Sequence, residues 1–462
     1  MNSLGWDDTI AAISTPLGIG GIGIVRISGP QARAIAQRLF RPRRGRAALR
    51  SHQFYLGEIL HPEEDRVLDE VLLVWMGKPK TYTREDVVEI HCHSGILILQ
   101  EILQAVLKCG ARLAEPGEFT KRAFLNGRID LTQAESVLDL IQAQTARSLE
   151  LAHQQRSGRL AQEVQRLRES LLDLLAHLEA QIDFPEEEIP ELSPAALAQR
   201  IGLLRDRLDS WIQTFREGKV YREGIATAIV GRPNVGKSSL LNALLRQDRA
   251  IVTPIPGTTR DVLEETVAVG GIPLRLMDTA GLRRAKDSIE AEGIRRTEEC
   301  LRMADLILWV VDGSQPLGPE DLDILEKIRS KKTVVALNKN DLPARVERDE
   351  LQGRLPEAPV VSISALRGTG LEELRKTVRA LVLKGKVEPS DTVLLTHLRH
   401  KQALERCRDA LRQALEAAAR RFSIEFVALD IRQALQALGE ITGETTSAEV
   451  LERIFQQFCI GK

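Results

Sequence analysis

Cysteine is scarce in this chain and scattered along it. Its 462 residues contain five cysteines, an odd number, at widely separated positions. A disulfide-stabilised secreted domain needs paired cysteines at regular spacing, so this pattern excludes a disulfide framework. The first residues also lack the basic and then apolar stretches of a secretory signal. We therefore expect a cytoplasmic protein in a reducing compartment.

Two further features are missing: a long apolar run and an excess of charge of one sign. The longest apolar run, at residues 306–311, is far shorter than the roughly 20 residues that a membrane-spanning helix needs. The net charge is −1, so no overall field attracts RNA or an anionic membrane. We expect no membrane contact, and any RNA contact has to come from a local patch.

The length and the local patterns predict about three domains. Residues 1–120 alternate short β-like runs with one helix and indicate an α+β domain. Residues 121–221 and 384–462 carry apolar residues three and four apart, which is typical of amphipathic helices that need a partner. We predict one discontinuous helical domain built from both stretches, with an α/β domain at 222–383 inserted in it. The alternative is two separate helical appendages.

The expected elements of the first domain can be given by range. The helix is Ile96–Lys108, and the strands are Thr9–Ser14, Gly23–Ser28, Phe54–Leu60, Val71–Met76 and Val87–Cys92.

A phosphate-binding loop is the clearest motif. Gly231-Arg-Pro-Asn-Val-Gly-Lys-Ser238 follows a short apolar strand and opens a helix, as the Walker A pattern requires. The two glycines let successive N–H groups point into one concavity at a helix N-terminus, where phosphate oxygens bind. Lys237 is expected to reach the β- and γ-phosphates, and the Ser238 hydroxyl to hold Mg²⁺. A chance glycine-rich turn is the alternative.

Three later motifs indicate that the base is guanine. Asp278-Thr-Ala-Gly281 follows a strand-like run, and its carboxylate can reach Mg²⁺ through water. Asn338-Lys-Asn-Asp341 follows the strand-like run at residues 334–337. Asp341 can accept hydrogen bonds from guanine N1–H and N2–H₂, which adenine lacks. Lys339 can lie over the base plane, and the segment Ser364-Ala-Leu366 can offer a backbone N–H to guanine O6. Four motifs in this order predict a Ras-like guanine-nucleotide domain.

Four other patterns admit competing interpretations. Gly18–Gly23 satisfies G-x-G-x-x-G, but it runs into a strand rather than a helix, which favours a turn over a dinucleotide site. His91 and His93 share a strand face, yet two ligands make a weak metal site and a structural role is favoured. The basic loop at residues 40–46 can contact phosphates or simply be solvated. Cys459 is either a small buried hydrophobe or a reactive thiol beside the cationic Lys462.

Taken together, these features resemble the MnmE (TrmE) family of potassium-activated TrmE–Era-like GTPases, over the whole length of the chain. The terminal Cys-Ile-Gly-Lys motif after an inserted nucleotide domain is the most specific of them. The segments that carry the resemblance are residues 8–12, 20–29, 116–120, 122–126, 182–187, 257–261 and 458–462.

The resemblance implies a GTPase that takes part in tRNA wobble uridine modification. By this resemblance the first domain binds a 5-formyl- or 5,10-methylene-tetrahydrofolate through Arg26, Glu89 and Arg128, with Lys462 approaching the same site. Arg26 and Glu89 also fit a plain cross-strand ion pair. The resemblance further implies a homodimer and an FAD-dependent partner, MnmG (GidA), since this chain shows no flavin site.

It also implies roles around the nucleotide. Leu282 stands where a Ras-like enzyme carries glutamine, so Glu290 takes over the orientation of the attacking water, and Lys237 and Cys459 complete the catalytic candidates. Mg²⁺ is expected on Ser238 and Thr259. K⁺ is expected on Asn234, Thr253, Ile255 and Thr258. The full nucleotide-binding set is Asn234, Val235, Gly236, Lys237, Ser238, Ser239, Thr253, Pro254, Ile255, Pro256, Gly257, Thr258, Thr259, Asp278, Thr279, Ala280, Gly281, Asn338, Lys339, Asp341, Ser364, Ala365 and Leu366.

Three functional hypotheses follow. In the first, GTP hydrolysis gates one-carbon or aminomethyl chemistry, which installs a (carboxymethyl)aminomethyl group at C5 of the wobble uridine. In the second, the protein is a regulatory RNA- or ribosome-associated switch without modification chemistry. In the third, it is a free-standing folate transferase with a regulatory nucleotide domain. The folate-type first domain and the terminal motif favour the first.

Overall fold

The computed structural model describes residues 7–43, 49–184, 186, 193–247, 265–277, 299–383 and 393–462. The chain forms two compact units. The first comprises residues 1–138, 155–174 and 435–462, and the second residues 139–154 and 175–434. Within the described residues, no helix is long and apolar enough to cross a membrane.

The first unit contains a seven-stranded sheet with the order β3-β4-β5-β6-β2-β1-β7. Neighbouring strands are antiparallel, except that β7 runs parallel to β1. The strands are β1 (Ile10–Ile13), β2 (Gly20–Ser28), β3 (Phe40–Pro42), β4 (Gln53–Leu60), β5 (Val67–Met76), β6 (Val87–Ser94) and β7 (Arg112–Leu113).

Helices α1 (Ala32–Leu39) and α2 (Ile96–Lys108) cover one face of this sheet. Alternate residues of a strand point to opposite faces, and Val25, Ile27 and Ile90 therefore join Leu99 of α2 in one buried cluster. The prediction of a helix over Ile96–Lys108 is confirmed to the residue. The five predicted strands are confirmed with bounds that differ by a few residues.

The opposite face of the sheet carries the polar side chains of the candidate site in this unit. Here Ile10 and Ala12 pack with Phe119 of α3 (Glu118–Leu125). Arg26 lies between Ala12 and Glu89 on neighbouring strands, on this same face.

The structure bears on two sequence interpretations in this unit. The glycines at 18–23 run into β2 and not into a helix, which rules out the strand-turn-helix context of a dinucleotide fingerprint. The basic loop begins with strand β3, and its Arg41 and Arg43 form ion pairs with Glu58 and Glu70.

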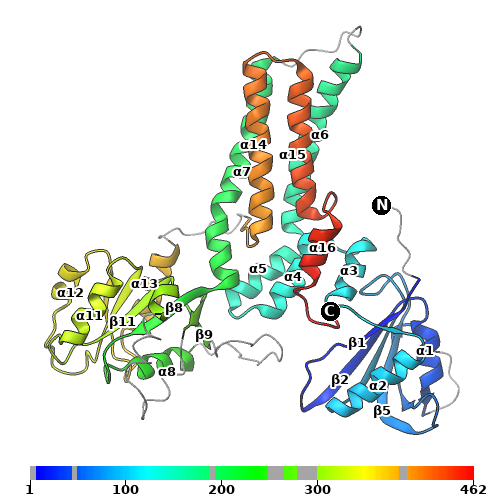
Figure 1. Ribbon diagram of the computed structural model, residues 1–462, viewed down its shortest axis with the longest axis horizontal. Helices are drawn as coiled ribbons and strands as arrows, with labels where there is room; N and C mark the ends of the chain where they lie inside the picture. Colours follow the sequence, from blue (N-terminus) through cyan, green and yellow to red (C-terminus); the bar gives the residue numbers. More distant parts are fainter. Residues whose placement is uncertain are drawn as a thin grey trace. The chain divides into compact units, whose positions relative to one another are not determined.

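The remaining helices come from the two flanks. They are α4 (Leu131–Gln142), α5 (Ala146–Arg156), α6 (Arg159–Asp183), α7 (Pro194–Glu223), α14 (Leu398–Ala419), α15 (Ile424–Thr442) and α16 (Ala448–Phe455). In the first unit, Leu131, Ala134 and Leu138 of α4 pack with Phe455 and Phe458 near the C-terminus. In the second unit, α7 and α14 lie side by side (Figure 1).

The second unit contains a six-stranded sheet with the order β13-β12-β11-β8-β10-β9. All pairs are parallel except β9 with β10. Its strands are β8 (Ile225–Val230), β9 (Glu265–Val269), β10 (Ile272–Leu276), β11 (Leu306–Asp312), β12 (Thr333–Asn338) and β13 (Val360–Ser362), and its helices are α8 (Lys237–Gln247), α11 (Pro319–Ile328), α12 (Arg348–Arg354) and α13 (Leu371–Leu383).

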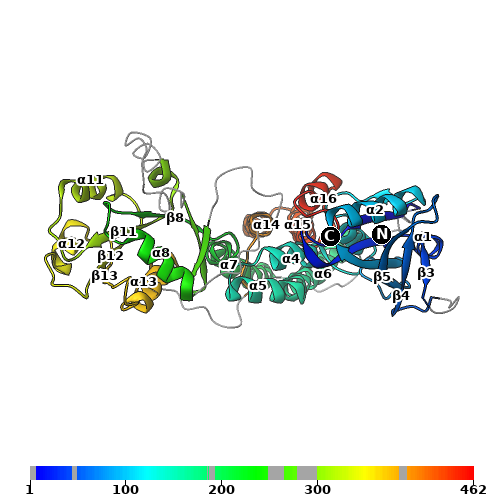
Figure 2. The ribbon, with the colours of Figure 1, turned by 90° about the horizontal axis from the view of Figure 1, so that it is seen from below.

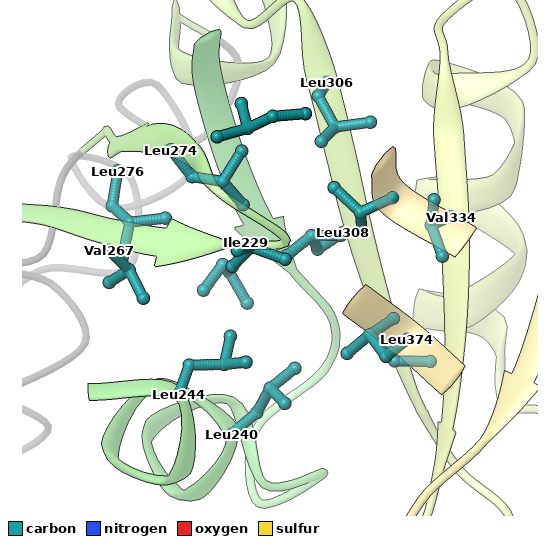
Figure 3. Close-up of a cluster of buried hydrophobic side chains, with 14 of the residues drawn as sticks. Ile229, Leu240, Leu244, Val267, Leu274, Leu276, Leu306, Leu308, Val334 and Leu374 are labelled. Atoms are coloured by element: carbon teal, nitrogen blue, oxygen red, sulfur yellow. The ribbon is translucent and has the colours of Figure 1, made fainter. Parts of the chain in front are cut away.

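Helices cover both faces of this sheet (Figure 2). On one face, Leu240 and Leu244 of α8 and Leu374 of α13 pack against Ile229 and Leu308 (Figure 3). On the other face, α11 and α12 bury a second cluster around Trp309. Strands β8 and β11 are buried on both sides, which explains why they read as continuous apolar runs. The carboxyl ends of β8, β10, β12 and β13 meet at one edge, where ligands of such folds bind.

Candidate functional site

The phosphate-binding loop joins β8 to α8, as the sequence predicts. Gly236 has a φ of 101°, and a Cβ atom there would lie 2.2 Å from Asn338 Nδ2. Only glycine fits this close approach. Asn234 also has a positive φ, of 63°, a conformation that asparagine tolerates better than most residues.

Lys237 turns its ammonium group back onto the loop. Its Nζ donates to Gly231 O at 2.6 Å and to Arg232 O at 2.8 Å. Burial lowers the pKa of this ammonium, and Glu320 offsets the effect only in part. A cation held by main-chain carbonyls in a partly desolvated place is suited to receive a phosphate, which would add a full opposite charge.

Asn338 connects the phosphate-binding loop to the later motifs. Its Nδ2 donates to Val235 O at 2.8 Å, and its Oδ1 accepts a hydrogen bond from Ala365 N at 2.9 Å. Asn338 is buried, so both hydrogen bonds are shielded from water. One side chain thereby aligns three of the predicted nucleotide-binding segments. The sequence placed Asn338 in the binding set but gave no sign of this bridge.

The residues predicted to recognise the base lie beside Asn338. Hydrogen bonding from Ser364 lowers the pKa of the Asp341 carboxyl, which is an ionised acceptor at neutral pH. Lys339 has a φ of 66° and places its Nζ 2.6 Å from Asp312 Oδ2. Leu366 is 86% exposed. Sequence reasoning missed Asp312, although its position at the carboxyl end of β11, on the ligand-binding edge, was a usable signal.

The Lys339–Asp312 pair has a clear electrostatic consequence. Burial raises the pKa of Asp312, but hydrogen bonds from Lys339 and Ser314 outweigh it, and the net pKa is lowered. The Lys339 ammonium is therefore anchored, and its aliphatic stem is held in place beside Asp341.

Several predicted site residues lie outside the described residues. They are Thr253, Pro254, Ile255, Pro256, Gly257, Thr258, Thr259, Asp278, Thr279, Ala280, Gly281 and Glu290.

A second constellation lies on the sheet face of the first unit. Arg26 Nη2 and Nε lie 2.8 Å and 2.9 Å from Glu89 Oε1, across the β2–β6 pair. The other oxygen, Glu89 Oε2, lies 3.2 Å from His91 Nε2. Arg26 also donates to Gly461 O at 3.3 Å, 435 residues away in sequence. The cation–carboxylate pair anticipated from the sequence is thus present, and the C-terminal segment reaches it.

The last residues of the chain are held at this place by main-chain contacts. Pro116 and Ile460 form an antiparallel bridge, and Ser14 Oγ donates to Gly461 O at 3.2 Å. Burial lowers the pKa of the Lys462 ammonium, and the nearby Arg26 lowers it further. Cys459 is a free and exposed thiol. Of its two interpretations, the buried hydrophobe is therefore wrong.

Arg128 and Arg26 each lie over an aromatic ring. The Arg128 guanidinium is 4.9 Å from the centre of the Tyr82 ring, and Arg26 is 5.7 Å from the centre of the Phe119 ring. The Tyr82 hydroxyl is hydrogen-bonded to Thr120 Oγ1 at 2.9 Å. Aromatic faces flanked by cations suit a flat, anionic ligand.

Histidines at 91 and 93 have carboxylate neighbours. His93 Nδ1 lies 2.8 Å from Asp69 Oδ1, and His91 contacts Glu89 as described above. Among the residues that the structure describes, no group of three or more metal-ligating side chains converges.

Two family models match the chain. One, described as the MnmE helical domain, matches residues 131–459, and the other, described as the N-terminus of the GTP-binding protein TrmE, matches residues 9–128. The tRNA modification GTPase MnmE of Heliobacterium modesticaldum is 49% identical over 463 residues, with 98% of this chain and 99% of the relative covered. The protein of the same name from Natranaerobius thermophilus is 48% identical, with 99% and 100% covered.

Solved structures resemble a smaller part of the chain. The G domain of the Thermotoga maritima FeoB iron transporter is 32% identical, covers 34% of this chain and 98% of its own, and has a TM-score of 0.25. An Era variant from Aquifex aeolicus bound to GDP and aluminium fluoride is 29% identical, with 40% of this chain and 65% of its own covered and a TM-score of 0.26. Scores this low establish no shared fold.

Proposed function

Because this chain belongs to the MnmE family of tRNA modification GTPases, we propose that GTP hydrolysis in its second unit drives chemistry at the wobble uridine of certain tRNAs. The chain is a GTP hydrolase involved in tRNA modification. The finer proposal concerns the product. With the FAD-dependent partner MnmG (GidA), it installs a (carboxymethyl)aminomethyl group at C5 of the uridine, with carbon from a one-carbon tetrahydrofolate.

The proposal of a folate site is supported by the contacts that Arg26 makes with Glu89 and with the C-terminal segment. Arg26 contacts both Glu89 and Gly461 O, and the Lys462 pKa responds to Arg26 and Glu89. Two cations fit the glutamate tail of a folate, and a carboxylate fits the N–H edge of a pterin. Arg128 over Tyr82 adds a third cation beside an aromatic ring. A bound tetrahydrofolate would supply the carbon, and these residues would orient it.

GTP is proposed to lie along the carboxyl edge of the second sheet. The loop from Asn234 to Ser239 would receive the phosphates, with Lys237 on the β/γ side. Asp341 would read the guanine edge, Lys339 would cover the base, and the segment Ser364-Ala-Leu366 would meet O6.

Two metal ions belong to this proposal. Ser238 and Thr259 would hold Mg²⁺, and Asn234 with the carbonyls of Thr253, Ile255 and Thr258 would hold K⁺. Asn234 has a positive φ, and the residue is exposed at the loop surface. A K⁺ ion supplies positive charge where it develops during hydrolysis. Glu290 would orient the attacking water, and Cys459 remains a candidate for covalent chemistry.

Partners complete the proposal. Association of two G domains across the nucleotide would make the active form a homodimer. The glycine pattern at residues 18–23 continues into strand β2 and not into a helix, so it does not fit a flavin fingerprint. We therefore propose that a separate protein supplies the FAD.

The test is mass spectrometry of tRNA nucleosides from a strain that lacks the gene. The proposal expects loss of the modified wobble uridine and its return when the wild-type chain is supplied, but not a Lys237→Ala chain. Unchanged wobble uridines in the deletion strain would favour the regulatory switch instead. Activity of the chain without the flavoprotein would favour the free-standing folate transferase.

A further inference from the structure

We propose that Arg84 and Arg156 form a further subsite of the first unit, which binds the poly-γ-glutamate tail of a reduced folate. We call these two residues the polyglutamate subsite. The inference rests on the proposed function, because it assumes that the folate itself binds at Arg26 and Glu89. It deepens that function by naming the form of folate that this chain prefers. All of these residues belong to the first unit.

The cations of the candidate folate site are already sufficient for a folate with one glutamate. The terminal glutamate of such a folate carries two carboxylates. Arg26 is paired with Glu89 at 2.8 Å, and the two further cations named above, Lys462 and Arg128, match those two carboxylates. Any additional cation beside them therefore has no carboxylate of a monoglutamate to bind.

Arg84 is such an additional cation, and it lies next to Arg128. Its Nη1 donates to Asn126 O at 2.8 Å, and a Cβ atom on Gly127 would lie 3.4 Å from the same nitrogen. Asn126 Nδ2 in turn donates to Thr83 O at 2.6 Å, so the segment that carries Arg84 and the turn after α3 hold each other. The Arg84 guanidinium is therefore fixed against the residue that precedes Arg128.

The backbone of Arg84 has a conformation that arginine disfavours. Its φ is 62°, in the left-handed region, which glycine would adopt without a steric cost. The side chain is exposed, and among the residues that the structure describes no carboxylate forms an ion pair with it. A guanidinium kept at a position that favours glycine points to a role for the side chain itself.

Arg156 comes from a different segment and is held by the main chain. Gln155 Nε2 donates to Thr132 O at 3.1 Å, and Gln133 Nε2 donates to Arg156 O at 3.0 Å. The segment therefore lies beside the first turn of α4, which closely follows Arg128 in sequence. The Arg156 side chain is exposed, and within the described part of the chain it has no carboxylate partner.

The arginines gather around the Tyr82 side chain. Arg128 lies 4.9 Å from the centre of its ring. Burial raises the pKa of Tyr82, and the hydrogen bond with Thr120 opposes this effect. The positive charges of Arg26, Arg128 and Arg156 oppose it as well, which places all three near the hydroxyl. An anionic chain that passes Tyr82 would therefore meet positive charge from three separate segments.

A chain of γ-linked glutamates fits this arrangement. Each added glutamate contributes one carboxylate, and a guanidinium binds a carboxylate through two parallel N–H groups. The net charge of the whole protein is −1, so the attraction is local to this cluster and does not extend over the surface as for a general RNA-binding protein. Because the cluster continues from the candidate folate site, the tail of the same ligand is the anion that would reach it.

The experiment measures the dissociation constants of the full-length protein for 5-formyltetrahydrofolate with one glutamate and with three, by calorimetry. We expect the triglutamate to bind about tenfold more tightly, because two exposed cation–carboxylate pairs each contribute a few-fold. This preference should shrink toward a ratio of 1 at high ionic strength, since salt screens exposed charges.

The diagnostic variants are Arg84→Gly and Arg156→Gln. Each should lower the preference for the triglutamate about threefold and leave the dissociation constant of the monoglutamate unchanged. Arg84→Gly should also keep the melting temperature, because glycine accepts the positive φ, and Arg84→Lys should retain part of the preference. The matched control is Arg66→Ala, which removes an exposed arginine of the same unit that pairs with Glu101. The control should keep the wild-type ratio.

Three results would overturn the inference alone: equal binding of both forms by the wild type, an intact preference in both variants, or an equal loss of preference in Arg66→Ala. Weaker tRNA binding by Arg84→Gly and Arg156→Gln with an intact preference would assign the two arginines to RNA and overturn it as well. A wild type that binds neither form would instead overturn the proposed folate site. Because the Arg156 side chain is exposed, Arg156→Gln keeps the test open if Arg84→Gly is unstable.

Discussion

Single side chains determine what the nucleotide site can bind. The Asp341 carboxyl is ionised, its pKa being lowered by hydrogen bonding from Ser364, and Lys339 is held beside it through Asp312. The Lys237 ammonium donates hydrogen bonds to two main-chain carbonyls of its own loop, those of Gly231 and Arg232. An ionised acceptor suited to the base and a cation suited to the phosphates therefore both lie at the carboxyl edge of this sheet.

Replacement of Asp341 by asparagine tests the base assignment. An amide presents one acceptor and one donor edge, so it loses a hydrogen bond to guanine but can pair with the O2 acceptor of xanthine. We expect GTP affinity to fall by about 100-fold or more, with XTP bound better than GTP. Fluorescent nucleotide titration measures both. If GTP and XTP affinities fell together, Asp341 would support the fold and not read the base.

Asn234 tests the proposed potassium site. We expect the GTPase rate of the wild type to rise strongly when Na⁺ is replaced by K⁺ at constant ionic strength, because the ion adds charge in the transition state. Asn234→Ala should abolish that rise while GTP binding is retained. The neighbouring Arg232→Ala should keep the rise, since its guanidinium lies near Asp321 and Gln315. Equal rates in both salts for the wild type would contradict the assignment.

At the scale of elements, the C-terminal segment packs closely against β1. Gly461 has a φ of 92°, and a Cβ atom there would lie 2.4 Å from Ile13 O. We expect Gly461→Val to push the segment away from β1 and to weaken binding of 5-formyltetrahydrofolate at least tenfold, with GTP affinity unchanged. Gly110→Val is the control, because it has a similar φ of 106° but no atom within 4 Å of a Cβ. Equal loss in both variants would point to general strain.

Helix α3 is attached by a buried network of charges. Arg122 is fully buried and contacts Asp8 Oδ1 at 2.8 Å and Glu118 Oε1 at 2.9 Å, and Arg112 contacts the same two carboxylates. We expect Arg122→Ala to lower the free energy of opening of α3 by about 1–3 kcal/mol, because the buried Glu118 loses one of its two guanidinium partners and keeps only Arg112. Hydrogen exchange of α3 amides measures this. Arg41→Ala, which breaks an exposed pair, should have little effect on α3.

The same network predicts a dependence on pH. Burial raises the pKa of Glu118, but Arg112 and Arg122 outweigh it, and its pKa lies below the ordinary value of 4.5. A carboxyl with a lowered folded-state pKa stabilises fully above its unfolded pKa and loses that contribution as the pH falls through the folded value. Opening of α3 should therefore become easier below about pH 4.5 in the wild type and less steeply so in Arg122→Ala, where Arg112 alone still pairs with Glu118. Parallel pH profiles would show that the network is not responsible.

The sequence predicted elements with strong periodicity and missed those made by tertiary contacts. Helix α2 was found to the residue because its apolar positions repeat every three or four residues. Helix α3 was missed because its buried face includes Glu118 and Arg122, which look like surface residues until the network is seen. Strands β3 and β7 span three and two residues, too few to show any alternation.

The same distinction holds for the site. The four nucleotide motifs are local, so they could be predicted from spacing alone. The Asn338 bridge and the Lys339–Asp312 pair join residues 27 to 103 positions apart. Such contacts leave no local pattern in a single sequence.

For the whole molecule, we assign the energy-releasing reaction and the one-carbon chemistry to different units. GTP hydrolysis is assigned to the carboxyl edge of the second sheet, and handling of a reduced folate to the face of the first sheet that carries Arg26 and Glu89. The domain boundaries of 1–120, 121–221 with 384–462, and 222–383 remain predictions. The arrangement requires that loss of either site stops tRNA modification, whatever the state of the other.

The most direct measurement is a reconstituted reaction followed by mass spectrometry of the tRNA. It contains the purified chain, the FAD-dependent partner, unmodified tRNA, GTP, K⁺ and ¹³C-labelled 5,10-methylene-tetrahydrofolate. We expect the modified wobble uridine to carry the label, and omission of GTP or the variant Arg26→Ala to remove it. A modified uridine without the label, or label that arrives equally well without GTP, would contradict this expectation.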